Sequence, residues 1–381
     1  MASSFLKDIK GLSASNYTFP AIRGIQAGRE YYICMCHLKL IPRIFLYDES
    51  DLPAELRAQR TLNRARIPDL ANYLVNNPGE YVFSSITASI IDAPVTFIPF
   101  GDSGIESKVG TIVIPMDARF LINDGQHRRA AIEEALKIRP EIGNETISVV
   151  LFLDAGLKRS QQMFSDLNRH AVRPTRSISI LYDHRDPLAA LSLKLAAKVP
   201  SFQGLTELEK TSLSNRSIKM FTLSSIYQAT QALLGKKAKV KRVTKAEEQL
   251  AIAYWTEVGE RIPEWQQLTR REVTSCALRR DCIHAHGVTL QALGIVGHQL
   301  VNTYPADWRE RLDPLREINW ARSNATNWEG RTMIGGRISK TQTSLALTAN
   351  LLKEALSLTL TPEEAEIEER FHHSGRGGLG T

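Results

Sequence analysis

ARFLINDGQHRRAAIEEALKI, residues 118–138, places an apolar run, an Asn-Asp-Gly turn and an Ala-rich helical pattern directly one after another. Residues 118–122 have strand character, and the apolar spacing of residues 127–138 is that of a helix. Gly125 between them supplies a backbone conformation that other residues rarely adopt. The stretch therefore predicts a strand that passes through a tight turn into a helix, as in α/β domains.

Strand and helix patterns alternate on both sides of this unit. Strand character occurs at residues 29–47, with an interruption at Pro42, at 81–90 and at 147–154, and a hairpin is expected within 92–118. Helical spacing occurs within 52–79, 157–172 and 187–199. This alternation predicts an α/β domain over residues 29–200, preceded by an N-terminal segment, 1–28.

The pattern changes beyond Pro200, where most segments have helical spacing. Residues 201–360 therefore predict a mainly α-helical domain, and the Gly-rich end of the chain predicts a disordered tail over 361–381. Together the two halves predict an α+β fold class.

The composition is that of a globular protein, with 43% hydrophobic and 23% charged residues among 381. No apolar run approaches the roughly 20 residues that a membrane-spanning helix needs. The first residues also lack the apolar core of a secretory signal, so we expect a cytoplasmic protein without membrane contact. The net charge of +7 suits a polyanionic partner such as nucleic acid, and is equally compatible with simple solubility.

The turn carries the residues best suited to an anion. A helix that begins directly after Gly125 presents unpaired backbone N–H groups, and its dipole favours negative charge there. His127 could add a charge-assisted hydrogen bond, and Arg128 a bidentate fork. In the alternative, Asp124 only caps the helix and the arginines face water. The predicted phosphate- or nucleotide-binding residues of the turn are Asn123, Asp124, Gly125, Gln126, His127 and Arg128.

A second polar group ends the helix predicted before Pro174. Asn168, Arg169 and Arg173 could form another wall of the same anion pocket. The alternative is that their charges only complement the C-terminal end of a helix dipole.

Two basic surfaces are predicted to contact DNA. Arg57, Arg60 and Arg64 share one helix face at i, i+3 and i+7 spacing. The densest basic run supplies Lys236, Lys237, Lys239, Lys241 and Arg242. Both could follow a phosphate backbone, and both could equally be solvated basic surfaces.

Two short strings raise the question of zinc. Cys34 and Cys36 lie in CMCH, and Cys282, His284 and His286 lie in CIHAH. Thiolates and imidazoles suit zinc, but neither spacing is that of a standard zinc motif. We therefore expect buried cysteines and surface histidines without a metal.

The Gly-rich string GRTMIGGRISK, residues 330–340, lacks the Lys that must follow the second Gly of a Walker phosphate loop. It does not predict a P-loop nucleoside triphosphatase, although Arg331, Arg337 and Lys340 could touch a DNA phosphate.

Several strings resemble known proteins. DGQHRRAA, residues 124–131, resembles the signature of DGQHR-domain proteins, and Gly125, His127, Arg128 and Ala131 fall on their pattern. Residues 163–189, 210–230 and 327–331 resemble the DndB family of DNA sulfur modification proteins, and the resemblance extends from about Tyr31 to Lys353. It implies a ParB- and sulfiredoxin-like core in which the motif opens a helix and holds nucleotide phosphates.

The resemblance implies a DNA-binding transcriptional repressor and modulator of DNA phosphorothioation. Its partners would be promoter or operator DNA and other DNA sulfur modification proteins, and the protein would act as a homo-oligomer. The alternative is an enzyme that binds a nucleoside triphosphate with magnesium, with Asp124 or His127 assisting metal placement or water activation. The catalytic cysteine that sulfiredoxins carry before the motif has no counterpart in residues 116–124.

Overall fold

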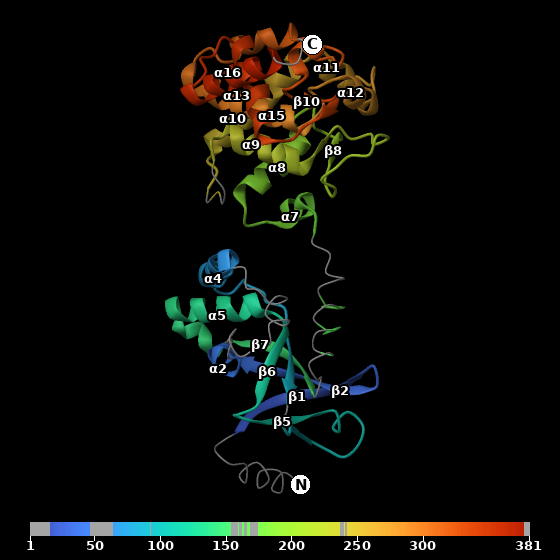
Figure 1. The fold of residues 1–381 in the computed structure, drawn as a ribbon, viewed down its shortest axis with the longest axis vertical. Coiled ribbons are helices and arrows are strands. Elements are labelled where there is room, and N and C mark those ends of the chain that lie inside the picture. The colour runs from blue at the N-terminus through green and yellow to red at the C-terminus, as the bar shows by residue number, and fades with distance from the viewer. Residues whose placement is uncertain are drawn as a thin grey trace. The chain divides into compact units, whose positions relative to one another are not determined.

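A computed structural model describes residues 16–45, 64–91, 93–153, 159, 162–163, 166–167, 174–236, 240 and 242–376. The chain forms two compact units, Met1–Val172 and Arg173–Thr381 (Figure 1). The fold is mixed α and β, and about half of it is helical. No helix within the described ranges is long and apolar enough to cross a bilayer.

A seven-stranded mixed sheet forms the centre of the first unit, in the order β4-β5-β1-β2-β7-β3-β6. Neighbouring strands are antiparallel except β3 and β7, which are parallel. The strands are β1 (Asn16–Gln26), β2 (Arg29–His37), β3 (Ile86–Ile91), β4 (Thr96–Pro99), β5 (Val109–Pro115), β6 (Arg119–Asp124) and β7 (Thr146–Leu153).

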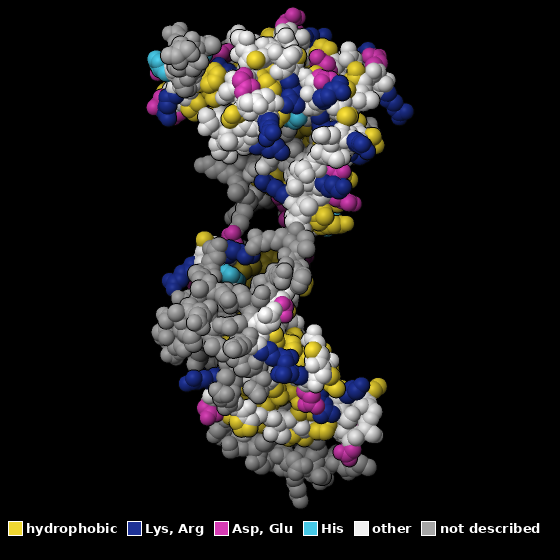
Figure 2. Space-filling model, turned by 45° about the vertical axis from the view of Figure 1, so that its right-hand side comes forward, with side chains coloured by type: hydrophobic (Ala, Val, Ile, Leu, Met, Phe, Trp, Pro, Cys, Tyr) yellow, Lys and Arg dark blue, Asp and Glu magenta, His cyan; other side chains and the backbone are white. Residues whose placement is uncertain are grey.

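Helices cover one face of this sheet (Figure 1). On β2, Cys34 and Cys36 are buried under the helices, whereas Ile33 and Met35 point to the opposite face and are exposed. Figure 2 shows hydrophobic side chains gathered over the first unit. The helices are α2 (Ile41–Ile44), α4 (Ile67–Asn76) and α5 (Gln126–Ile138), with short 3-10 turns η1 (Leu38–Leu40), η2 (Arg64–Arg66) and η3 (Pro140–Asn144).

The structure confirms the local units with the clearest sequence signals. The predicted strand, turn and helix are β6, Gly125 and α5, and the predicted hairpin is the antiparallel pair β4 and β5. The long strand predicted over 29–47 is wrong for residues 38–45, which follow the end of β2 at His37 and include η1 and α2, while residues 46 and 47 lie outside the described ranges. Pro42 lies in the first turn of α2, where its missing N–H costs nothing.

The second unit is mainly helical and has one core around Trp255, Trp265 and Trp320. Helices α7 and α8 lie within it, although the sequence grouped them with the preceding domain, and Leu188 and Leu195 share the core of α9. The elements are α7 (Arg176–Tyr182), α8 (Pro187–Lys198), β8 (Thr206–Glu207), β9 (Phe221–Thr222), α9 (Leu223–Leu233), α10 (Lys245–Arg261), α11 (Pro263–Thr269), α12 (Ser275–Asp281), α13 (Gly287–Thr303), η4 (Glu310–Arg316), α14 (Ala325–Trp328), β10 (Met333–Ile334), β11 (Arg337–Ile338), α15 (Gln342–Ala355) and α16 (Pro362–Arg376).

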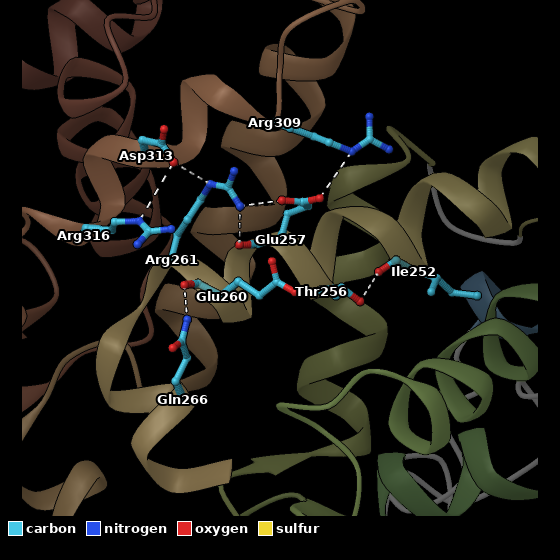
Figure 3. A network of polar contacts seen from close by, with 9 residues as sticks. All are labelled: Ile252, Thr256, Glu257, Glu260, Arg261, Gln266, Arg309, Asp313 and Arg316. Carbon is cyan, nitrogen blue, oxygen red and sulfur yellow. Dashed lines mark hydrogen bonds and ion pairs between the residues drawn. The ribbon is translucent and has the colours of Figure 1, made fainter. Parts of the chain in front are cut away.

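Ion pairs join α10 to the 3-10 turn η4. Arg261 lies between Glu257, 2.5 Å away on its own helix, and Asp313 of η4, 3.1 Å away (Figure 3). Its side chain is 11% exposed, so these contacts are partly shielded from water. Figure 3 also shows Arg309 reaching the same Glu257 from the η4 side. The network fixes how these two elements pack.

The C-terminal segment differs from the disordered tail that the sequence predicted. Residues 362–376 form α16, which packs on α15. Glu368 pairs with Arg331 at 2.6 Å, and Glu364 pairs with Lys353 at 2.5 Å. Both Arg331 and Lys353 are buried, and α16 supplies the carboxylates that compensate their charge.

Candidate functional site

The turn between β6 and α5 has the backbone that its glycine predicts. Gly125 has a φ of 107°, and a Cβ there would lie 3.3 Å from the Cα of Ile86 on the neighbouring strand β3. The N-terminus of α5 receives no capping hydrogen bond from a side chain. The N-cap residue is Gly125, which has no side chain, so this position gives α5 no side-chain cap.

Asp124 instead holds Arg128. The Nη2 atom of Arg128 donates to Asp124 Oδ2 at 2.7 Å and to the backbone oxygen of Ser85 at 2.9 Å. Its Nε is buried without a hydrogen-bond partner among the described residues. Nη2 thus fixes Arg128 beside the helix N-terminus. The other nitrogens of the guanidinium remain able to donate hydrogen bonds.

Arg66 is a further cation near the same turn, and it affects His127. Burial, followed by the charges of Arg66 and Arg128, lowers the pKa of His127, while Asp124 acts in the opposite direction. The imidazole is therefore mainly neutral near pH 7. Arg66 comes from η2, just before α4, which packs on α5.

Two polar residues of the motif serve the fold instead. Asn123 is fully buried and donates to Ser89 Oγ at 2.7 Å, so it fastens β6 to β3. Arg129 is 9% exposed and donates to the backbone oxygens of Phe45 and Pro42. The alternative in which the arginines face water is wrong for Arg129, which joins α5 to α2.

The other predicted contacts are only partly within the described structure. Arg64 and Arg242 are exposed, whereas Lys236 pairs with Glu247 at 2.5 Å. Sequence reasoning missed Arg66 as a neighbour of His127, because the contact depends on how α4 packs on α5. The remaining predicted residues lie outside the described ranges: Arg57, Arg60, Asn168, Arg169, Arg173, Lys237, Lys239 and Lys241.

The CIHAH string forms a buried polar cluster in which Glu264, Cys282 and His284 lie within 4.8 Å of one another. His284 is fully buried, so its predicted surface position is wrong. Trp265 Nε1, which can only donate, gives a 2.9 Å hydrogen bond to Nδ1 of His284. The proton of the neutral imidazole then lies on Nε2, which faces Glu264 at 3.5 Å and lacks a lone pair for a metal. The geometry favours a Trp–His–Glu chain over a metal centre.

Fold and site together define a two-unit α+β protein with a basic, uncapped strand-to-helix turn. Residues 19–359 match the model of the DndB family, described as DNA-sulfur modification-associated. The chain belongs to this family, which confirms the resemblance of its sequence. No curated protein and no solved structure matches it.

Gly125→Ala is expected to destabilise the first unit more than Gly79→Ala does. Both glycines have nearly the same φ, 107° and 109°, so an L side chain meets similar strain of about 1–2 kcal/mol. Only at Gly125 would the new Cβ also crowd Ile86 and Arg128, whereas nothing lies within 4 Å at Gly79. Urea unfolding measures both losses, and equal losses would disprove the close approach.

Proposed function

We propose that the protein is a DNA-binding regulator of DNA sulfur modification that represses transcription, and that the N-terminus of α5 holds a DNA backbone phosphate. One observation supports this most strongly. In a member of the DndB family, an uncapped helix N-terminus lies beside Arg128, with His127 and Arg66 close by. Helix N–H groups and an arginine fork are complementary to phosphate oxygens.

Such a contact positions DNA without reading its sequence. Exposed Arg64 and Arg242 would add phosphate contacts, and the net charge of +7 favours association with a polyanion. Figure 2 shows several Lys and Arg side chains on the visible face of the second unit. We propose a ParB-like role for the first unit and operator binding as a homo-oligomer.

Nucleoside triphosphate hydrolysis fits the turn less well. Asp124 Oδ2 accepts a hydrogen bond from Arg128 at 2.7 Å, so this oxygen is not free to take a proton from an attacking water. A nucleotide phosphate could still occupy the helix N-terminus. We therefore propose binding of phosphate at this turn without hydrolysis, with DNA as its source.

Binding to the promoter of the protein's own operon tests this function. Fluorescence anisotropy should show tighter binding to that duplex than to a scrambled duplex of equal length, and a reporter fused to the promoter should be repressed. Calorimetry with ATP and magnesium runs in parallel. Equal affinity for both duplexes together with an unrepressed reporter would refute the regulator role, and ATP turnover would support the enzyme.

DNA affinity is expected to rise as the pH falls from 8 to 6. The pKa of His127 is lowered in the free protein, and a phosphate beside it would raise that pKa. At a pH between the pKa of His127 in the free protein and its pKa in the complex, DNA binding takes up a proton. Lowering the pH therefore strengthens binding. His127→Gln should flatten this pH dependence, and His37→Gln, at an exposed histidine, should not. The same pH slope in wild type and His127→Gln would contradict the contact.

A further inference from the structure

A basic cavity of about 420 Å³ lies within the second unit, apart from the turn described above. Four cationic residues line it, and the lining includes no Asp or Glu. Two of these cations end α12, and the others follow in the segments around α14 and β11: Arg279, Arg280, Arg322 and Lys340. A cavity of this size can enclose a ligand as large as a nucleotide.

The N-termini of two packed helices meet at this cavity. Thr222 and Ser225 at the start of α9 line it, as do His286 and Gly287 at the start of α13. A Cβ on Gly287 would lie 2.7 Å from Ser225 Oγ, so the two helix ends approach closely. Because α13 has no side-chain cap, its first N–H groups and dipole add positive potential at the cavity.

Most of the charge in this cavity is not neutralised by the protein. Arg280 pairs with Asp281, but Arg279, Arg322 and Lys340 form no ion pair with a carboxylate in the described part of the chain. Burial and then the charge of Arg322 lower the pKa of His286 to about 4, so this imidazole is neutral at pH 7. The excess charge therefore comes from Arg279, Arg322 and Lys340 and not from the histidine.

Backbone contacts hold two of the arginines in place. Arg279 donates to the carbonyl oxygens of Ser214 and Ser217, which fixes the 211–220 loop as a wall of the cavity. Arg322 donates to the carbonyl oxygens of Arg280 and Gly336 at 3.2 and 2.7 Å. The cations are thus arranged before a ligand arrives, which reduces the entropy cost of binding.

We propose that this cavity binds the phosphate groups of a small organic anion of nucleotide size. A doubly or more highly charged phosphate matches three cations without a carboxylate partner and the N-terminus of α13 better than a single carboxylate does; the N-terminus of α9 is already capped by Thr222. The limited volume favours a small ligand over duplex DNA. This site lies beyond the proposed DNA contact and does not depend on it.

Calorimetry on the full-length chain tests the site, with sodium pyrophosphate and ATP as probes and sodium sulfate as the comparison anion. We expect saturable binding of both probes, one per chain, and weaker binding of sulfate. Lys340→Gln and Arg322→Gln should each weaken pyrophosphate binding about tenfold or more. Arg337→Gln is the matched control, since Arg337 is exposed and lies three residues before Lys340 outside the lining.

Any one of the following four outcomes would overturn the proposal. Lys340 is exposed, so Lys340→Gln should remain folded even where Arg322→Gln does not, and unchanged binding by it would reject the site. Loss of binding in Arg128→Gln with retention in Lys340→Gln would place the anion at the α5 turn instead. Displacement of pyrophosphate by duplex DNA would reject a small ligand. Equal, unsaturable binding of sulfate and pyrophosphate would indicate an adventitious ion only.

Discussion

Arg331→Met is expected to lower the free energy of unfolding of the second unit by about 3–5 kcal/mol. The side chains of Arg331 and Glu368 are each 7% exposed, and their ion pair is 2.6 Å long. Removing the arginine leaves a buried carboxylate without its main cation, which costs more than the pair itself contributes. Because Glu368 lies on α16, the helix should also detach more easily. Urea unfolding and hydrogen exchange of α16 measure the two effects.

Arg370→Met is the matched control on the same helix. Arg370 pairs with Glu366, but their side chains are 71% and 62% exposed, so the loss should stay below about 1 kcal/mol. Arg331→Met combined with Glu368→Met should recover much of the lost stability, because no buried charge is then left alone. Similar losses in Arg331→Met and Arg370→Met would show that α16 is not held by this pair.

Arg128→Gln is expected to weaken promoter binding about 10- to 100-fold. The variant removes a guanidinium that Asp124 and the Ser85 carbonyl hold beside the N-terminus of α5. A charge-assisted hydrogen bond to phosphate is among the stronger single contacts in such a complex. Anisotropy with the promoter duplex at fixed salt measures the loss, and thermal unfolding shows whether the variant is folded.

Two further variants test whether the lost affinity comes from a phosphate contact at this turn. Arg119→Gln removes an exposed cation at the opposite end of β6 and should change DNA affinity little. Asp124→Asn removes a negative charge beside the proposed phosphate, so DNA binding should be kept or strengthened. Weaker binding in Asp124→Asn would contradict this expectation and show that the carboxylate itself, which holds Arg128, supports binding.

Local signals predicted the central unit of the fold. The strand, Gly125 and the helix follow one another within 21 residues, 118–138, so no distant contact was needed to recognise them. The strand β1 was missed because Pro20 interrupts its pattern and its place in the sheet depends on long-range pairing with β2 and β5. Likewise, the acidic sequence of α16 has a tail-like composition until its buried cations are known.

The sequence identified residues of the candidate site but not how they lie relative to one another. The motif indicated Gly125 and Arg128, yet it could not show that Arg129 is buried or that Asp124 binds Arg128. Those roles depend on which face of α5 packs on the sheet and on α2. Arg66 approaches His127 only through tertiary packing, so sequence spacing gave no sign of it.

The salt dependence of promoter binding by wild type and Arg128→Gln tests the phosphate contact at the α5 turn. For wild type, the logarithm of the association constant should fall linearly with the logarithm of the salt concentration, because bound phosphates release counterions. If Arg128 holds one phosphate, Arg128→Gln should have a slope smaller by about one. Identical slopes and affinities for the two proteins would show that DNA phosphate does not bind at this turn.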